Sequence, residues 1–366
     1  MRYFFFSKRL VFCYSLLLVA GIAFSQKYSN EFLSIGVGAR AQALGNAVVA
    51  NIDDVTAAYW NPAGLLRIDE NTGLQIGAMH AEWFAGVGKF DYLGATLPLA
   101  DGNRRLGLSI IRFGIDNIPN TLSLFESDGT INYDNIVEFS AADYAFLLSY
   151  AQALKVKSGT LNVGGNVKIV RRIIGSFANS WGFGLDLGMQ YQLKKLRLGL
   201  IARDITTTFN AWKINFTEDE KQVLLNTGNE LPDINSNEIT KPSFLLGLAY
   251  RFDFKNFGIS PELDMNFTTD GKRNTLVSSD PISIDPGFGV EADYKKAVFL
   301  RAGIDQFQKE TDFEGKENLL VRPSLGVGLK VGGFQLDYAY TDLGDQRNTY
   351  SHVISLVLSL KKRKSE

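Results

Sequence analysis

The chain has 366 residues, and its 38 basic and 39 acidic side chains leave a formal net charge of −1. That near-neutral balance argues against a nucleic-acid-binding surface, which needs clustered positive charge. No apolar run reaches the eighteen or so residues that a membrane-spanning helix requires, so helical spans are excluded.

The N-terminus predicts a secretory signal peptide. A charged start ending in Lys8 and Arg9 is followed by a short apolar stretch over 10–24 and by a small-residue cleavage site that ends at Ser25, which together are typical of such signals. The alternative is a membrane anchor, but the stretch is short for a span of ~20 residues. Because Cys13 is the single cysteine, the mature chain is predicted to hold no disulfide, thiolate metal site or cysteine nucleophile.

Residues 26–71 lack the alternation of a strand and are punctuated by glycine. Asp53 or Asp54 is expected to cap a short helix that runs to Trp60, and Asn61-Pro62 then ends it with a turn. We expect this compact segment to fold inside or beneath the lumen of a barrel as a hatch. The alternative is an unstructured periplasmic arm.

Alternation with a period of two dominates residues 72–360. In the segment 183–193, for example, the odd-numbered residues are apolar, whereas the even-numbered ones are Gly, Asp or Gln. Successive side chains of a strand point to opposite faces, so each segment has one apolar and one polar face. A soluble sandwich would also alternate. The membrane barrel is favoured because the segments are ~10 residues or longer and because their apolar faces are nearly pure.

Fourteen such segments follow one another, and an even number is typical of bacterial single-chain barrels. The connections between them alternate between short turns and long loops, the longest being 115–142 and 207–241, which places both mature termini in the periplasm. We therefore predict an all-β fold, a 14-stranded antiparallel transmembrane β-barrel. The predicted strands are 72–84, 87–99, 104–114, 143–155, 159–173, 180–194, 196–206, 242–254, 256–269, 284–295, 297–308, 321–332, 334–342 and 349–360.

The outer loops carry the candidate partner-binding residues. Thr217 and Glu220 form a capping box that predicts a short helix over 218–226. Exposed aromatic residues are common interface anchors, and the alternative is that they pack over the barrel mouth. The candidates are Phe125, Phe209, Trp212 and Phe216.

Inward-facing charges of both signs are expected to share the lumen. Cross-strand pairing and contacts with the hatch are favoured over a charged pore lining. These charges are Asp186, Arg197, Arg203, Arg251, Glu262, Asp264, Glu291, Asp293, Arg301, Asp305, Lys330 and Asp337.

Few side chains in the sequence could take part in catalysis. The two histidines, His80 and His352, both lie in predicted strands, and His352 shares its face with leucine and isoleucine, which argues against a serine–histidine pair. No ligands are clustered at metal-binding spacing. We expect no enzyme activity, no cofactor and no metal.

Three motifs carry a family resemblance: Gly38-Ala39-Arg40, Leu44-Gly45-Asn46-Ala47 and Trp60-Asn61-Pro62-Ala63-Gly64-Leu65. They resemble the N-terminal signature of the PorV/PorQ family, within the FadL-like group of fourteen-stranded barrels with an N-terminal hatch. The resemblance covers nearly the whole mature chain, and it implies a role in type IX secretion. Its hatch motif falls on Gly38, Arg40, Gly45, Asn61, Pro62, Ala63 and Gly64.

The leading hypothesis is therefore a non-enzymatic outer-membrane barrel that binds secretion-system subunits or exported cargo at the cell surface. The alternative is a FadL-like channel for hydrophobic small molecules, and a third possibility is a purely structural barrel. Outer-membrane lipid is a further expected partner, and no nucleic acid is expected. The predicted segments are the signal peptide 1–25, the hatch 26–71, the barrel 72–360 and a basic tail 361–366.

Overall fold

The computed structural model describes residues 29–83, 86–99, 102–126, 128–228, 230–231, 235–311, 315–342 and 350–362. The predicted signal peptide, with its cleavage site at Ser25, lies outside the described residues. So do residues 363–366 of the predicted tail.

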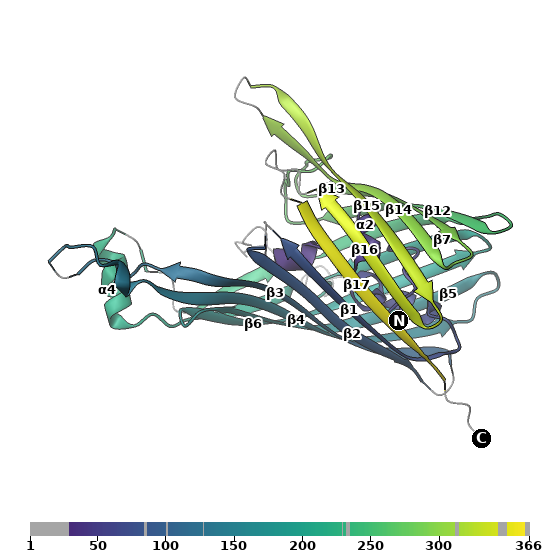
Figure 1. The fold of residues 1–366 in the computed structure, drawn as a ribbon, viewed down its shortest axis with the longest axis horizontal. Coiled ribbons are helices and arrows are strands. Elements are labelled where there is room, and N and C mark those ends of the chain that lie inside the picture. Colours follow the sequence, from purple (N-terminus) through teal and green to yellow (C-terminus); the bar gives the residue numbers. More distant parts are fainter. Residues whose placement is uncertain are drawn as a thin grey trace, which may run out of the picture.

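The strands form one antiparallel sheet that closes into a barrel, because β1 pairs with both β2 and β17 (Figure 1). Fourteen strand positions surround the lumen, so the predicted 14-stranded antiparallel barrel is confirmed. The ring consists of β1 (Thr72–Trp83), β2 (Gly88–Pro98), β3 (Arg104–Asn120), β4 (Val137–Leu154), β5 (Thr160–Ile174), β6 (Ala178–Leu193), β7 (Leu196–Arg203), β10 (Ser243–Tyr250), β12 (Phe257–Thr268), β13 (Ser283–Tyr294), β14 (Val298–Thr311), β15 (Glu317–Val331), β16 (Phe334–Asp342) and β17 (Tyr350–Lys361).

The outward face of the barrel is apolar and the inward face is polar or small. Leu187 on β6 is 53% exposed, whereas its neighbour Asp186 is 5% exposed. Large apolar side chains on the outer surface are stable only if lipid covers them, and the strand alternation puts them there. The outward face therefore contacts membrane lipid. Separately, no helix within the described ranges is long and apolar enough to cross a membrane.

Two predicted loops contain strand. β3 does not end at 114, as predicted, but runs on to Asn120. A bulge between Ile115 and Ile118 shifts its register against β4. Asn117 has a φ of 58° there. A bulge adds one residue to one strand, so it interrupts the alternation on which the predicted strand end depended. The prediction of a single loop over 115–142 is therefore wrong.

The predicted loop 207–241 also contains regular structure. The strand predicted over 196–206 stops at Arg203 in β7, and β8 (Thr208–Ile214) continues it, followed by α4 (Glu218–Asn226) and β9 (Asn235–Thr240). The predicted capping box of α4 is confirmed, since the side chains of Thr217 and Glu220 each accept from the other's backbone N–H. These elements project beyond one side of the barrel, at the end opposite the C-terminus (Figure 1). A further short strand, β11 (Phe252–Asp253), prolongs β10.

Residues 29–71 fold inside the lumen and are called the hatch below. They form η2 (Glu31–Ser34), α2 (Ala39–Ala43), α3 (Ala57–Trp60) and η3 (Pro62–Arg67). On the side of β1–β5 the hatch packs against an apolar inner wall, where buried side chains such as Phe90, Ile111 and Leu147 meet its own apolar residues. On the side of β12–β16 it meets charged groups instead. The hatch therefore has one hydrophobic and one ionic attachment to the wall.

Candidate functional site: a hatch-filled lumen and an outer chamber

Glycines surround the hatch where it crosses the lumen. A Cβ at Gly303 would lie 2.1 Å from the backbone N of Gly45, and a Cβ at Gly199 would lie 2.4 Å from the backbone O of Val49. These distances are shorter than any van der Waals contact, so the hatch backbone occupies the space of the missing side chains. We call the glycines at which hatch backbone fills this space the glycine girdle: Gly164, Gly199, Gly247, Gly287, Gly289 and Gly303.

The ionic attachment centres on Arg40 of the hatch. Its guanidinium pairs with Asp53 at 2.5 Å and with Glu291 of β13 at 3.0 Å. Glu291 also pairs with Arg301 at 2.7 Å, and Arg301 pairs with Asp337 at 2.7 Å. Burial opposes ionisation of Asp53, yet the nearby arginines, Arg40 first, hold its pKa at about 2. Asp53 therefore stays ionised. The pairs of Arg301 with Glu291 and with Asp337 join different strands, so the predicted cross-strand pairing of lumen charges is confirmed for these residues.

Two further wall carboxylates bind the hatch backbone. Asp264 Oδ2 accepts from the backbone N–H of Val48 at 2.8 Å and of Val49 at 2.9 Å, while Glu262 Oε1 accepts from Ala50 at 2.7 Å. Each of these hydrogen bonds satisfies a buried backbone donor of the hatch. They fix this turn of the hatch against β12.

Six of the seven predicted hatch-motif residues contact the barrel wall, and Gly64 packs within the hatch. Gly38 (φ 93°) and Gly45 (φ 59°) adopt backbone conformations that glycine favours. Asn61 is fully buried, and its side-chain amide donates to the carbonyls of Val49, Met189 and Leu200. The remaining contacts are those of Arg40 with its carboxylates, of Pro62 and Ala63 with Gly164, and of Gly64 with Ile52.

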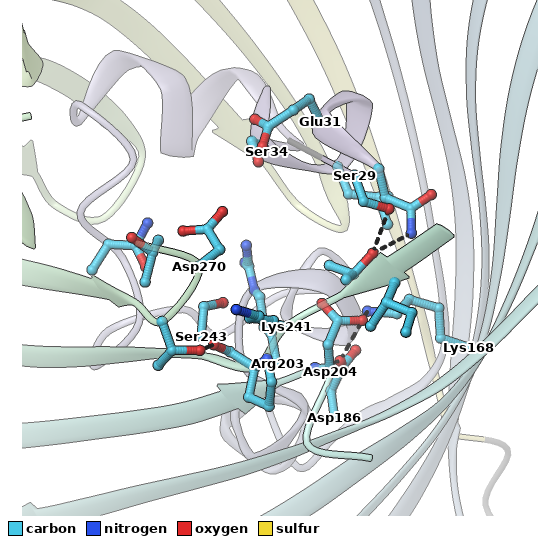
Figure 2. Close-up of a pocket in the computed structure, with 18 of the residues that line it drawn as sticks. Ser29, Glu31, Ser34, Lys168, Asp186, Arg203, Asp204, Lys241, Ser243 and Asp270 are labelled. Carbon is cyan, nitrogen blue, oxygen red and sulfur yellow. Dashed lines mark hydrogen bonds and ion pairs between the residues drawn. The ribbon is translucent and has the colours of Figure 1, made fainter. Parts of the chain in front are cut away.

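A cavity of about 90 Å³ lies on the side of the hatch that is extracellular in the predicted topology, and it is called the outer chamber (Figure 2). Its lining is mixed. Leu33, Leu147 and Ile239 supply apolar surface, whereas Arg203 and Lys241 supply charge. A neighbouring cavity of about 300 Å³ shares Arg203 with it. The two cavities together offer space for a small amphiphilic molecule.

The barrel wall is interrupted beside this chamber. Six residues, 203–208, oppose only three residues, 184–186, of β6, so the chain bulges between β7 and β8. On the other side, 204–207 face only 241–242. Pro242 has no N–H to donate to a ladder, and among the described residues no backbone hydrogen bond joins these two short segments. The chamber therefore reaches a weak point in the wall.

A buried ion cluster fixes the bulge. The ammonium of Lys168 on β5 lies 3.0 Å from Asp186 and 2.5 Å from Asp204, and its side chain is 4% exposed. The backbone N–H of Asp204 donates to Asp186 at 2.9 Å. Figure 2 shows these three side chains together at one side of the chamber.

We expect Lys168→Met to lower the free energy of unfolding by about 3–5 kcal/mol, because it leaves two buried carboxylates without their cation. Lys195→Met is the control, since Lys195 pairs with Asp253 through half-exposed side chains and should cost at most about 1 kcal/mol. Chemical unfolding of the reconstituted barrel measures both. Equal losses in the two variants would contradict this role of Lys168.

The predicted partner-binding residues do not form one surface. Phe125 is 62% exposed in the loop after β3, and Phe209 is 54% exposed on β8. Trp212 lies under Arg172, and its indole donates to Glu238 at 2.9 Å. Phe216 packs on Phe177, with ring centroids 5.6 Å apart. Their role in partner binding stays a prediction.

The two histidines make simple pairs on the outward face. His80 lies 2.7 Å from Asp91, and His352 lies 2.8 Å from the Tyr338 hydroxyl. In the described part of the chain, no group of three His, Cys, Asp or Glu side chains is placed to hold a metal ion.

Sequence reasoning missed the outer chamber and the Lys168 cluster. Pro242 in an otherwise strand-like segment was the available signal of a wall interruption. The cluster itself left none, because Lys168 and Asp186 lie on separate strands and Asp204 lies in the bulge.

Comparison with solved structures identifies the fold. The monoaromatic hydrocarbon channel CymD is 13% identical, with a TM-score of 0.53 over 90% of this chain and 98% of that chain. The toluene transporter TodX of Pseudomonas putida is 13% identical, with a TM-score of 0.52 over 88% of this chain and 97% of that chain. A FadL homologue of Pseudomonas aeruginosa is 13% identical, with a TM-score of 0.53 over 89% and 98%.

These similarities show that the chain has the fold of a FadL-like outer-membrane barrel. No protein-family model and no curated protein sequence matches it. The predicted FadL-like fold is thus confirmed, whereas none of these comparisons supports the PorV/PorQ assignment. The similar structures are described as channels and transporters, not as enzymes.

Proposed function

We propose that the chain is an outer-membrane channel for small hydrophobic or amphiphilic molecules, as in the alternative hypothesis above. The observation that carries this proposal is the position of the outer chamber, between the hatch and the wall interruption at 204–207 and 241–242. Because the hatch fills the lumen at the glycine girdle, a molecule in the chamber has a route through the wall that avoids the hatch.

Two further observations support a channel. The chamber lining combines apolar residues with charged groups such as Arg203, which suits a molecule with an apolar body and a polar end. The inner wall of β1–β5 behind the hatch is apolar as well. The similar solved structures include channels for monoaromatic hydrocarbons and toluene.

Purification from native membranes in a mild detergent tests this proposal. Mass spectrometry of the purified barrel should find hydrophobic or amphiphilic small molecules and no protein at a stoichiometric amount. A stoichiometric protein partner without any bound small molecule would contradict the channel.

The second candidate is the leading hypothesis from the sequence, a PorV/PorQ-like barrel that binds secretion-system subunits or exported cargo. One observation favours it: the projection formed by β3, β4, β8, α4 and β9 extends beyond the barrel (Figure 1), and it carries exposed large apolar side chains. Tyr133 is 70% exposed, Val137 59% and Leu225 55%. Exposed apolar groups gathered on such a projection are typical of protein-binding surfaces. Co-purification of secretion subunits or cargo in the same experiment would support this candidate.

A further inference from the structure

Another cavity, of about 320 Å³, opens beneath the hatch at the opposite end of the barrel. This end is periplasmic in the predicted topology, because Thr72 at the start of β1 pairs there with Lys361 at the end of β17. The hatch forms its roof, and the turns β6–β7 and β13–β14 contribute to its rim. We call it the periplasmic vestibule. Eight basic and only four acidic side chains line it.

Each of the four acidic groups already has a cation. Asp53 and Glu291 pair with Arg40, and Asp253 and Asp293 pair with Arg251.

The remaining positive charge is not neutralised. Within the described ranges, no carboxylate lies within ion-pair distance of Lys194, Arg197, Lys296 or Lys330. All four of these groups line the vestibule.

Buried donors in the same cavity lack acceptors. Arg301 is 4% exposed, and its Nη2 has no hydrogen-bond partner, although its other nitrogens bind Glu291 and Asp337. The Nε of Arg197 is buried and also lacks a partner. Above the vestibule, burial and repulsion from Arg197 lower the pKa of Arg67 to about 10. Positive charge is thus crowded around a solvent-filled space, and an anion there would supply the missing acceptors.

We propose that the periplasmic vestibule is a binding site for a ligand that carries several carboxylates. A single carboxylate would leave most of the four unpaired cations without a partner. Carboxylates fit because the guanidinium of arginine matches their planar geometry. The arginine–carboxylate pairs within the wall already use this match. The source is either a small polycarboxylate or an acidic segment of a periplasmic protein. This site is independent of whether the barrel conducts.

Calorimetric titration of the mature chain in detergent, at low ionic strength, tests the site. The probes are citrate and a short polyglutamate peptide, with a polylysine peptide as the negative control. We expect saturable binding of at least one acidic probe, and we expect it to weaken as added salt shortens the Debye length. Binding of citrate alone identifies a small-molecule site. Tighter binding of the peptide identifies a docking site for an acidic segment.

Charge-reversed variants place the binding in the vestibule. Lys296 and Lys330 are exposed on its rim, so Lys296→Glu with Lys330→Glu should weaken binding about tenfold or more without unfolding the barrel. The matched control is Lys255→Glu with Lys295→Glu. It makes the same charge change in periplasmic turns outside the vestibule, and binding should be unchanged. Equal weakening in both double variants, or no saturable binding of either acidic probe, would overturn the proposal.

Discussion

Gly303→Leu should release the hatch from the lumen. A Cβ at this position lies 2.1 Å from both the Gly45 nitrogen and the Leu44 carbonyl carbon, and main-chain atoms cannot move aside as a side chain can. Overpacking typically costs about 1–3 kcal/mol even where side chains can yield. Since the strands of β13, β14 and β15 are hydrogen-bonded into a closed ring, the hatch is the part that moves. Planar-bilayer conductance should rise from a closed level to that of an open barrel.

Ala302→Leu provides the control for that experiment. Ala302 is the next residue of β14 but is exposed on the outward, lipid-facing side, where a larger apolar side chain is tolerated. Trypsin treatment followed by mass analysis gives a second readout, because Arg40 is buried while the hatch is in place, with a side chain 11% exposed. If Gly303→Leu folds with the hatch still protected and the conductance still low, the girdle does not hold the hatch.

Straightening the wall should abolish transport. Removing Asp204–Thr206 and Lys241, together with Pro242→Val, makes the facing segments equal in length. Three residues then face 184–186 of β6, and on the other side residue 207 faces residue 242. Arg203 and Thr208 both face the lumen in the native barrel, and after the deletion a single residue, Thr207, separates them. Inward and outward side chains therefore still alternate, so the hydrogen bonds between the strands can form. Uptake should then fall to the level of cells that carry no barrel, although the residues of the hatch are unchanged and Lys168 keeps Asp186 as its partner.

A length-matched deletion separates that effect from general damage. Removing Leu122–Leu124 and Gly129 shortens an outer loop by the same number of residues, far from the chamber. Uptake should persist in this control, with both variants migrating as folded barrels in unheated gels. Full uptake by the straightened barrel would show that molecules do not leave through the wall at 204–207.

The sequence was sufficient to predict the barrel because lipid imposes a simple rule on every strand. In β6 the outward residues are apolar and the inward residues polar, and that pattern is visible without knowing any pairing. The rule fails where strands leave the membrane. From Asn117 onward no residue of β3 is buried, so alternation no longer identifies a strand, and the extension was predicted as a loop.

The sites were harder to predict because they depend on register. Lys168, Asp186 and Asp204 meet through the pairing of β5, β6 and the bulge, which one sequence does not specify. The girdle glycines were visible as small residues on polar faces, but their purpose follows only from the hatch backbone that lies against them. The inward charges were correctly expected to pair, whereas the unpaired excess at the periplasmic end emerged only from the three-dimensional arrangement.

Transport itself is the central claim, and uptake by intact cells tests it most directly. Cells with an intact outer membrane that express the full chain should take up a radiolabelled monoaromatic hydrocarbon faster than cells that express the wall-straightened variant at the same level. Equal uptake by cells with the native barrel, cells with the straightened barrel and cells with none would contradict a channel.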